Sequence, residues 1–216
     1  MINLGNIFIL GDSYSTFKGC IPEGYDAWYS PEGRPETDVN AVEQTWWKQL
    51  LSQTKSDMLL NCSYSGTTVC NTGYDGEDCS YKSFIARLDK LVQIGYFREN
   101  QVDTFFIFGG TNDSWAEAPV GELKYAQWEK EELYSVLPAF CYLLHTAKAN
   151  VAARIVCIIN TNLKQPIADG FRTACEHYGI EWIVLNDIDK MNGHPSIRGM
   201  EQIKQQILHY FEMNER

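Results

Sequence analysis

The chain has 216 residues, of which 44% are apolar and 21% are charged, and its formal net charge is −10. This composition is typical of a globular protein with a substantial core, so extensive disorder is excluded. No apolar run approaches the roughly 18 residues that a membrane-spanning helix needs. A surface this negative repels phosphate groups, so we expect no nucleic-acid partner.

The N-terminus and the cysteines indicate the compartment. The first residues lack the basic segment, the long apolar segment and the cleavage site of a secretory signal. The chain has seven cysteines without a Cys-x-x-Cys pair, and a zinc or disulfide role stays open only for Cys62, Cys70 and Cys79. We therefore expect a reduced, cytoplasmic protein.

Short apolar segments predict five strands. In chain order they cover residues 7–10, 58–61, 104–108, 154–160 and 181–185. Most are continuously apolar, which is typical of parallel strands covered on both faces. Apolar residues three and four apart predict helices within residues 42–51, 84–92, 134–149, 167–178 and 197–211. The alternation predicts a single α/β domain over residues 1–216, a three-layer α/β/α sandwich with a five-stranded parallel sheet.

Two long segments, residues 18–40 and 63–82, show neither the helix nor the strand period. Loops of this length inside a compact domain are often functional. Four polar segments also follow the predicted strands, at the edge where open parallel sheets bind ligands. These segments contain Ser13, Gly66, Asn112 and His194.

These four residues are of the types that a serine hydrolase site needs. A serine hydroxyl becomes a nucleophile when a base takes its proton, and His194 is the one histidine predicted at this edge. The backbone N–H groups of Ser13 and Gly66 and the Asn112 amide are candidate donors to an oxyanion. Taken singly, each residue has a structural interpretation. Ser13 would be a helix N-cap, Gly66 a turn residue, Asn112 an Asx-turn residue and His194 a loop residue before a helix. Their common placement favours a catalytic site.

The four segments resemble the sequence blocks of the SGNH (GDSL-type) hydrolases, a superfamily of esterases, lipases, thioesterases and carbohydrate deacetylases. The matching residues are 11–15, 65–66, 109–113 and 194–196. The resemblance implies a flavodoxin-like SGNH hydrolase fold, with Ser13 as nucleophile and His194 as general base. It also implies that Gly66 and Asn112 complete the oxyanion hole. The mechanism requires no metal or organic cofactor.

The chain departs from the family pattern at one position. The family usually places an aspartate three residues before the histidine, and Met191 stands there in this chain. Three partners for the imidazole stay open. They are Asp189, Asp187 and a backbone carbonyl, the last of which leaves a Ser–His dyad.

Aromatic residues indicate the substrate class. Tyr25, Trp28, Tyr29 and Trp115 are candidates for a pocket wall that suits a sugar face or a small acyl group, or they pin a long loop to the body. We expect a serine esterase acting on a small acyl ester, such as an acetylated carbohydrate. An acyltransferase and a non-catalytic module that binds a glycan or an acyl group are the alternatives, and the oligomeric state stays open.

Overall fold

A five-stranded parallel sheet forms the centre of the computed structural model, which describes residues 1–214. The strands lie in the order β2-β1-β3-β4-β5, and every neighbouring pair is parallel. Their bounds are β1 Asn3–Gly11, β2 Lys55–Ser63, β3 Thr104–Gly109, β4 Arg154–Ile159 and β5 Glu181–Val184. The predicted fold class and all five predicted strands are confirmed.

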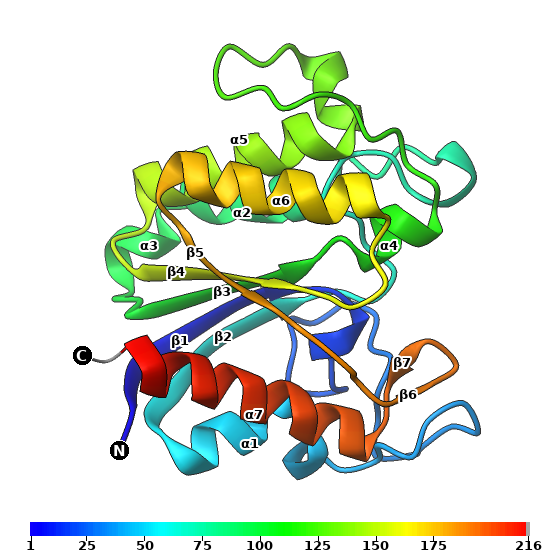
Figure 1. Cartoon of the computed structure of the whole chain (residues 1–216), viewed down its shortest axis with the longest axis vertical. Helices are drawn as coiled ribbons and strands as arrows, with labels where there is room; N and C mark the ends of the chain where they lie inside the picture. The colour runs from blue at the N-terminus through cyan, green and yellow to red at the C-terminus, as the bar shows by residue number, and fades with distance from the viewer. Residues whose placement is uncertain (215–216) are drawn as a thin grey trace.

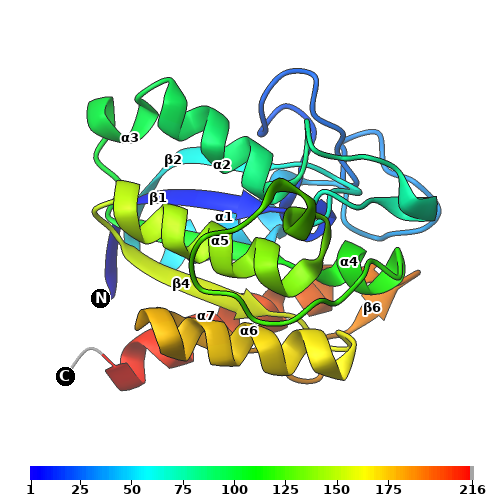
Figure 2. The same ribbon diagram turned by 90° about the horizontal axis from the view of Figure 1, so that it is seen from above.

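Helices cover both faces of this sheet (Figure 1). One face carries α2 (Phe84–Gln93), α3 (Tyr96–Glu99), α5 (Val136–Asn150) and α6 (Gln165–Tyr178). The other face carries α1 (Trp46–Gln53) and α7 (Ile197–Asn214). Figure 2 shows α5 between α2 and α6 on the first face. The sequence prediction missed α3 and the five-residue α4 (Thr111–Trp115), because so few residues show no period.

The two faces of the sheet belong to two hydrophobic cores. Ile7 and Ile9 of β1 pack in the core beneath α1 and α7, whereas Phe8 and Leu10 pack in the core beneath α2, α5 and α6. Successive side chains of a strand point to opposite faces, so a strand buried on both faces must be apolar throughout. This is why the strands are visible in the sequence as continuous apolar runs.

The long irregular segments gather at the edge formed by the carboxyl ends of the strands. Tyr64 N donates to Gly11 O at 3.1 Å, and Ser65 N donates to Asp26 O at 2.9 Å, so the two long loops are joined there. The same edge carries α4 and a small antiparallel hairpin, β6 (Lys190–Met191) with β7 (His194–Pro195) (Figure 1). This edge holds the residues that the sequence singled out.

The cysteines of the described chain are free thiols, and all but Cys20 are buried. Cys62 and Cys70 pack in the core on the α2, α5 and α6 face. None of the helices in residues 1–214 combines the length and the hydrophobicity of a membrane span.

Candidate active site

Ser13 lies two residues after the end of β1 and begins a single 3₁₀ turn, Ser13–Ser15. The Asp12 carboxylate caps this turn by accepting a hydrogen bond from Tyr14 N at 3.0 Å. The capping residue is therefore Asp12, and Ser13 does not act as the N-cap that its sequence context allowed. The Ser13 hydroxyl is therefore not used in capping and is able to bond to another group.

Side chains from α1 and β2 hold this turn in place. The indole N–H groups of Trp46 and Trp47 donate to Ser15 Oγ at 3.2 Å and to Ser15 O at 3.0 Å. Asn61 Nδ2 donates to the same carbonyl at 2.8 Å. Both tryptophans are buried core residues, and they also fix the turn that presents Ser13.

His194 lies on β7 within hydrogen-bonding distance of the serine. Its Nε2 is 2.9 Å from Ser13 Oγ, and its Nδ1 is 3.2 Å from Asn192 O. A carbonyl oxygen only accepts, so the proton of the neutral imidazole sits on Nδ1. Nε2 then offers its lone pair to the Ser13 hydroxyl, which is the tautomer that a general base needs.

A backbone carbonyl therefore orients the imidazole where the family usually has a carboxylate. Asn192 and Gly193 form the turn of the β6–β7 hairpin with φ of 46° and 80°, and Met191 pairs with His194 across it. The Asp189 carboxylate accepts a hydrogen bond from Ser196 Oγ instead.

Asp187 is exposed on the preceding turn. Within residues 1–214, neither Asp187 nor Asp189 bonds to His194. The structure thus does not place Asp189 beside the base. Asp189 immediately precedes β6, and its carboxylate accepts its hydrogen bond from Ser196 Oγ.

Gly66 and Asn112 come from the segments after β2 and β3. Gly66 has a φ of +74°, a conformation that favours glycine. Asn112 Nδ2 donates to Thr67 O at 3.0 Å, and its Oδ1 accepts from Tyr74 OH at 2.7 Å. These two bonds fix which way the amide faces, and they use only one of its two N–H groups. Tyr74 could not be predicted as a site residue, because it lies in a segment with neither the helix nor the strand period.

Buried charged groups connect the loops around the site. The Asp113 carboxylate accepts from Val69 N at 2.9 Å and from Cys70 N at 3.2 Å. Arg87 of α2 donates to Thr67 Oγ1 at 3.0 Å. The segment after β3 and the segment that carries Gly66 are therefore held together by side-chain bonds to backbone and hydroxyl groups.

Burial also sets the protonation of the site. It lowers the pKa of His194 to about 4, an effect that the Asn192 carbonyl opposes and the positive charges of Arg34 and Lys190 reinforce. The imidazole is neutral near neutral pH, so it is able to accept a proton. Burial raises the pKa of Asp12 to about 7 and that of Asp113 to about 6.

Aromatic rings enclose the imidazole. The Trp28 ring is stacked on it, with ring centroids 3.6 Å apart and an angle of 7° between the planes. Trp115 meets it edge-on at 5.5 Å and 66°, and is 42% exposed. These two of the four predicted aromatic residues lie at the site.

The other two aromatic residues have structural contacts. Tyr29 is fully buried, and its hydroxyl donates to Pro195 O at 2.9 Å. Tyr25 stacks on Tyr64, with centroids 4.6 Å apart. Tyr29 therefore fastens the long loop to the hairpin that carries His194.

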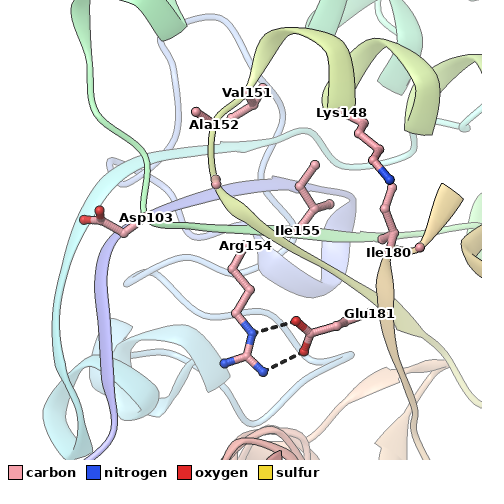
Figure 3. A pocket seen from close by; sticks show the side chains of 10 residues that line it. Asp103, Lys148, Val151, Ala152, Arg154, Ile155, Ile180 and Glu181 are labelled. Carbon is pink, nitrogen blue, oxygen red and sulfur yellow. Dashed lines mark hydrogen bonds and ion pairs between the residues drawn. The ribbon is translucent and has the colours of Figure 1, made fainter. Parts of the chain in front are cut away.

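A separate hollow of about 500 Å³ lies at the opposite edge of the sheet, where β4 and β5 begin (Figure 3). Its charged side chains have partners, since Arg154 Nη2 lies 2.6 Å from Glu181 Oε2 and Lys148 Nζ donates to Tyr178 O. Ligands of open parallel sheets bind at the carboxyl ends of the strands, so this hollow is not the candidate site.

The fold together with this site is that of an SGNH hydrolase. A family model for GDSL-like lipases and acylhydrolases matches residues 5–211. The chain therefore belongs to the GDSL-like lipase/acylhydrolase family, and it is an ester hydrolase.

Solved structures agree with this assignment. A protein of Bacteroides ovatus described as a GDSL-like lipase is 45% identical with a TM-score of 0.90, over 98% of this chain and 99% of that one. A protein of Bacteroides uniformis with the same description is 45% identical with a TM-score of 0.90, over 97% of this chain and 96% of that one.

A family two carbohydrate esterase from Clostridium thermocellum, in complex with cellohexaose, shares the fold. It is 16% identical with a TM-score of 0.61, over 99% of this chain and 65% of that one. No curated protein matches the chain.

Proposed function

We propose that this ester hydrolase cleaves small acyl esters through an acyl-enzyme on Ser13, with His194 as general base and then general acid. The observation that carries the proposal is the 2.9 Å contact between Ser13 Oγ and His194 Nε2. The bond from Nδ1 to the Asn192 carbonyl supports it, because that bond leaves the Nε2 lone pair facing the hydroxyl.

In the proposed acylation, His194 Nε2 takes the proton of Ser13 as Oγ attacks the ester carbonyl carbon. The N–H groups of Ser13, Gly66 and the Asn112 amide stabilise the negative oxygen of the tetrahedral intermediate. The imidazolium then gives its proton to the departing alcohol, and the acyl group stays on Ser13. Water attacks this acyl-enzyme with His194 again as base, and the carboxylic acid is released.

The surroundings of the nucleophile favour a small acyl group. Ser13 is 2% exposed and His194 is 5% exposed. An exposed indole such as that of Trp115 suits a sugar ring. We therefore propose an acetylated carbohydrate as the substrate class, a proposal in keeping with the shared fold of the cellohexaose-bound carbohydrate esterase.

The test compares hydrolysis of p-nitrophenyl acetate by the native protein, by Ser13→Ala and by the exposed control variant Ser52→Ala at mildly alkaline pH. We expect turnover by the native protein and by Ser52→Ala, with Ser13→Ala at background. Activity should fall from the acetyl to the octanoyl ester. Full activity of Ser13→Ala would overturn the proposed nucleophile. A native protein inactive on both p-nitrophenyl acetate and acetylated oligosaccharides would overturn the proposed substrate class.

A further inference from the structure

We propose that Trp28 is the positioning residue of the general base. Its indole face holds the His194 imidazole in the plane in which Nε2 meets Ser13. No carboxylate of residues 1–214 hydrogen-bonds to the imidazole to do this. The inference rests on the proposed function, because it assumes that His194 handles the proton of Ser13. Trp28 acts through His194 and touches no reacting atom.

The imidazole needs such support because its one orienting hydrogen bond is weak. The distance from Nδ1 to Asn192 O is 3.2 Å, at the long end for an N–H···O bond, and the acceptor is uncharged. The angular preference at a carbonyl oxygen is broad, so this bond alone lets the ring tilt. Tilting moves Nε2 away from the line to Ser13 Oγ.

A parallel ring at contact distance prevents that tilt. The Trp28 and His194 planes are 7° apart with centroids at 3.6 Å, so a tilted imidazole would push its edge into the indole. The other rings in contact with it do not define its plane. Trp115 meets it at 66° and Tyr14 at 51°, both with centroids 5.5 Å away, and Tyr29 meets it at 84° with centroids 6.5 Å apart.

The indole is itself held to the nucleophile's turn. Trp28 N donates to Thr16 Oγ1 at 2.9 Å, and Thr16 Oγ1 in turn donates to Ser13 O at 3.0 Å. The guanidinium carbon of Arg34 lies 4.1 Å from the centroid of the Trp28 ring. Trp28, His194 and the turn of Ser13 are thus one connected unit, so the stack places the base relative to the nucleophile.

The experiment compares Trp28→Leu, which keeps an apolar side chain without a flat face, with Trp28→Phe, which keeps a face. Trp128→Leu is the matched control, since Trp128 is half-buried and packs against Tyr142 of α5 with centroids 5.4 Å apart. Each variant is assayed for kcat/KM on p-nitrophenyl acetate and on an alkyl acetate. The alkoxide of the alkyl ester requires a proton from His194, whereas the nitrophenolate does not.

We expect Trp28→Leu to lower kcat/KM about 100-fold on the alkyl ester, the cost of misplacing a catalytic group by about 1 Å, and less on the nitrophenyl ester. Trp28→Phe should stay within about 3-fold of the native protein, because a phenyl ring also stacks on an imidazole. Trp128→Leu should be unchanged. A loss of folded protein would lower both rates by the same factor, so the difference between the two esters reports the position of the base.

Native-like activity of Trp28→Leu, equal losses for Trp28→Leu and Trp28→Phe, or equal losses on the two esters would overturn the inference. If Trp28→Leu melts below the assay temperature, Trp28→Met takes its place under the same criteria. Ser13→Ala separates this inference from the proposed function. An active Ser13→Ala variant defeats both, whereas an inactive Ser13→Ala beside a fully active Trp28→Leu defeats only the role of Trp28.

Discussion

His194 Nδ1 donates a hydrogen bond to the carbonyl oxygen of Asn192. A carboxylate in that place would stabilise the imidazolium that forms during acyl transfer, and a neutral carbonyl does so less. Arg34 and Lys190 add positive charge nearby, which disfavours the imidazolium further. At the scale of single residues, we therefore expect an enzyme that is slower than one with a complete triad.

A substitution of Asp189 tests this account of the base. We expect Asp189→Asn to change kcat/KM less than about 10-fold, against about 10⁴ for the loss of a triad aspartate, because its carboxylate contacts Ser196. The measurement is kcat/KM on p-nitrophenyl acetate beside His194→Ala, which should lose nearly all activity. A loss in Asp189→Asn approaching that of His194→Ala would show that the Asp189 carboxylate does orient His194.

The pH profile tests the protonation of His194. Its pKa is lowered to about 4, so the imidazole stays neutral as the pH falls and becomes protonated only near that value. The acid limb of kcat/KM should therefore lie near pH 4, well below the ordinary histidine value of about 6.5. Tryptophan fluorescence at each pH checks that the protein stays folded. An acid limb of kcat/KM near pH 6.5 in a protein that is still folded would contradict the lowered pKa of His194.

The β6–β7 hairpin shows how one short element sets the geometry of the base. Its two turn residues, Asn192 and Gly193, both have positive φ, as a two-residue type I′ turn requires. This turn aims the Asn192 carbonyl at the imidazole two residues later. The Asn-Gly pair was visible in the sequence, but strands of two residues show no period, so the hairpin was not predicted.

A glycine substitution tests the hairpin. Gly193→Ala adds a Cβ at a φ of +80° that lies 3.0 Å from the Trp115 ring. We expect a loss of about 1–2 kcal/mol in the free energy of unfolding. We also expect a fall of about 10-fold in kcat/KM as the carbonyl shifts. Gly24→Ala is the control, because its φ is +83° and nothing lies within 4 Å of the added Cβ. If both variants keep native kcat/KM, the hairpin does not aim the base.

The parts of the site that sequence could predict are those that follow buried strands. Ser13 and Asn112 come two and three residues after the ends of β1 and β3, whose apolar runs are visible in the sequence, so their edge of the sheet was predictable. The stack of Trp28 and the bond from Tyr74 to Asn112 depend on the paths of two aperiodic loops. Tertiary contacts fix those paths, and no local pattern encodes them.

On the scale of the whole molecule, buried carboxyl groups link stability to pH. Burial raises the pKa of Asp12 from 3.8 to about 7, so the folded protein keeps a proton that the unfolded chain releases near pH 4. The contribution of Asp12 to stability is therefore greatest below pH 4 and is lost as the pH rises to about 7. One of its oxygens, Oδ2, is buried without a hydrogen-bond partner in the described chain, in keeping with a costly ionised form.

Asp12→Asn tests this linkage. The variant cannot ionise, so its free energy of unfolding should rise relative to that of the native protein between about pH 4 and pH 7, and the difference should be constant above pH 7. Chemical denaturation across this range measures the difference. A difference independent of pH would show that Asp12 is ionised in the folded protein throughout.

The nucleophile and the base are 181 positions apart in the chain. They come into contact only when the β6–β7 hairpin, which carries His194, docks beside the end of β1, which Ser13 follows. A ribosome adds about 5–20 residues per second, so roughly 10 to 40 s pass between the synthesis of Ser13 and that of His194. During this interval the nascent protein carries an unactivated serine and, under the proposed mechanism, hydrolyses no ester. Return of esterase activity during refolding would likewise report the docking of the hairpin rather than formation of the sheet.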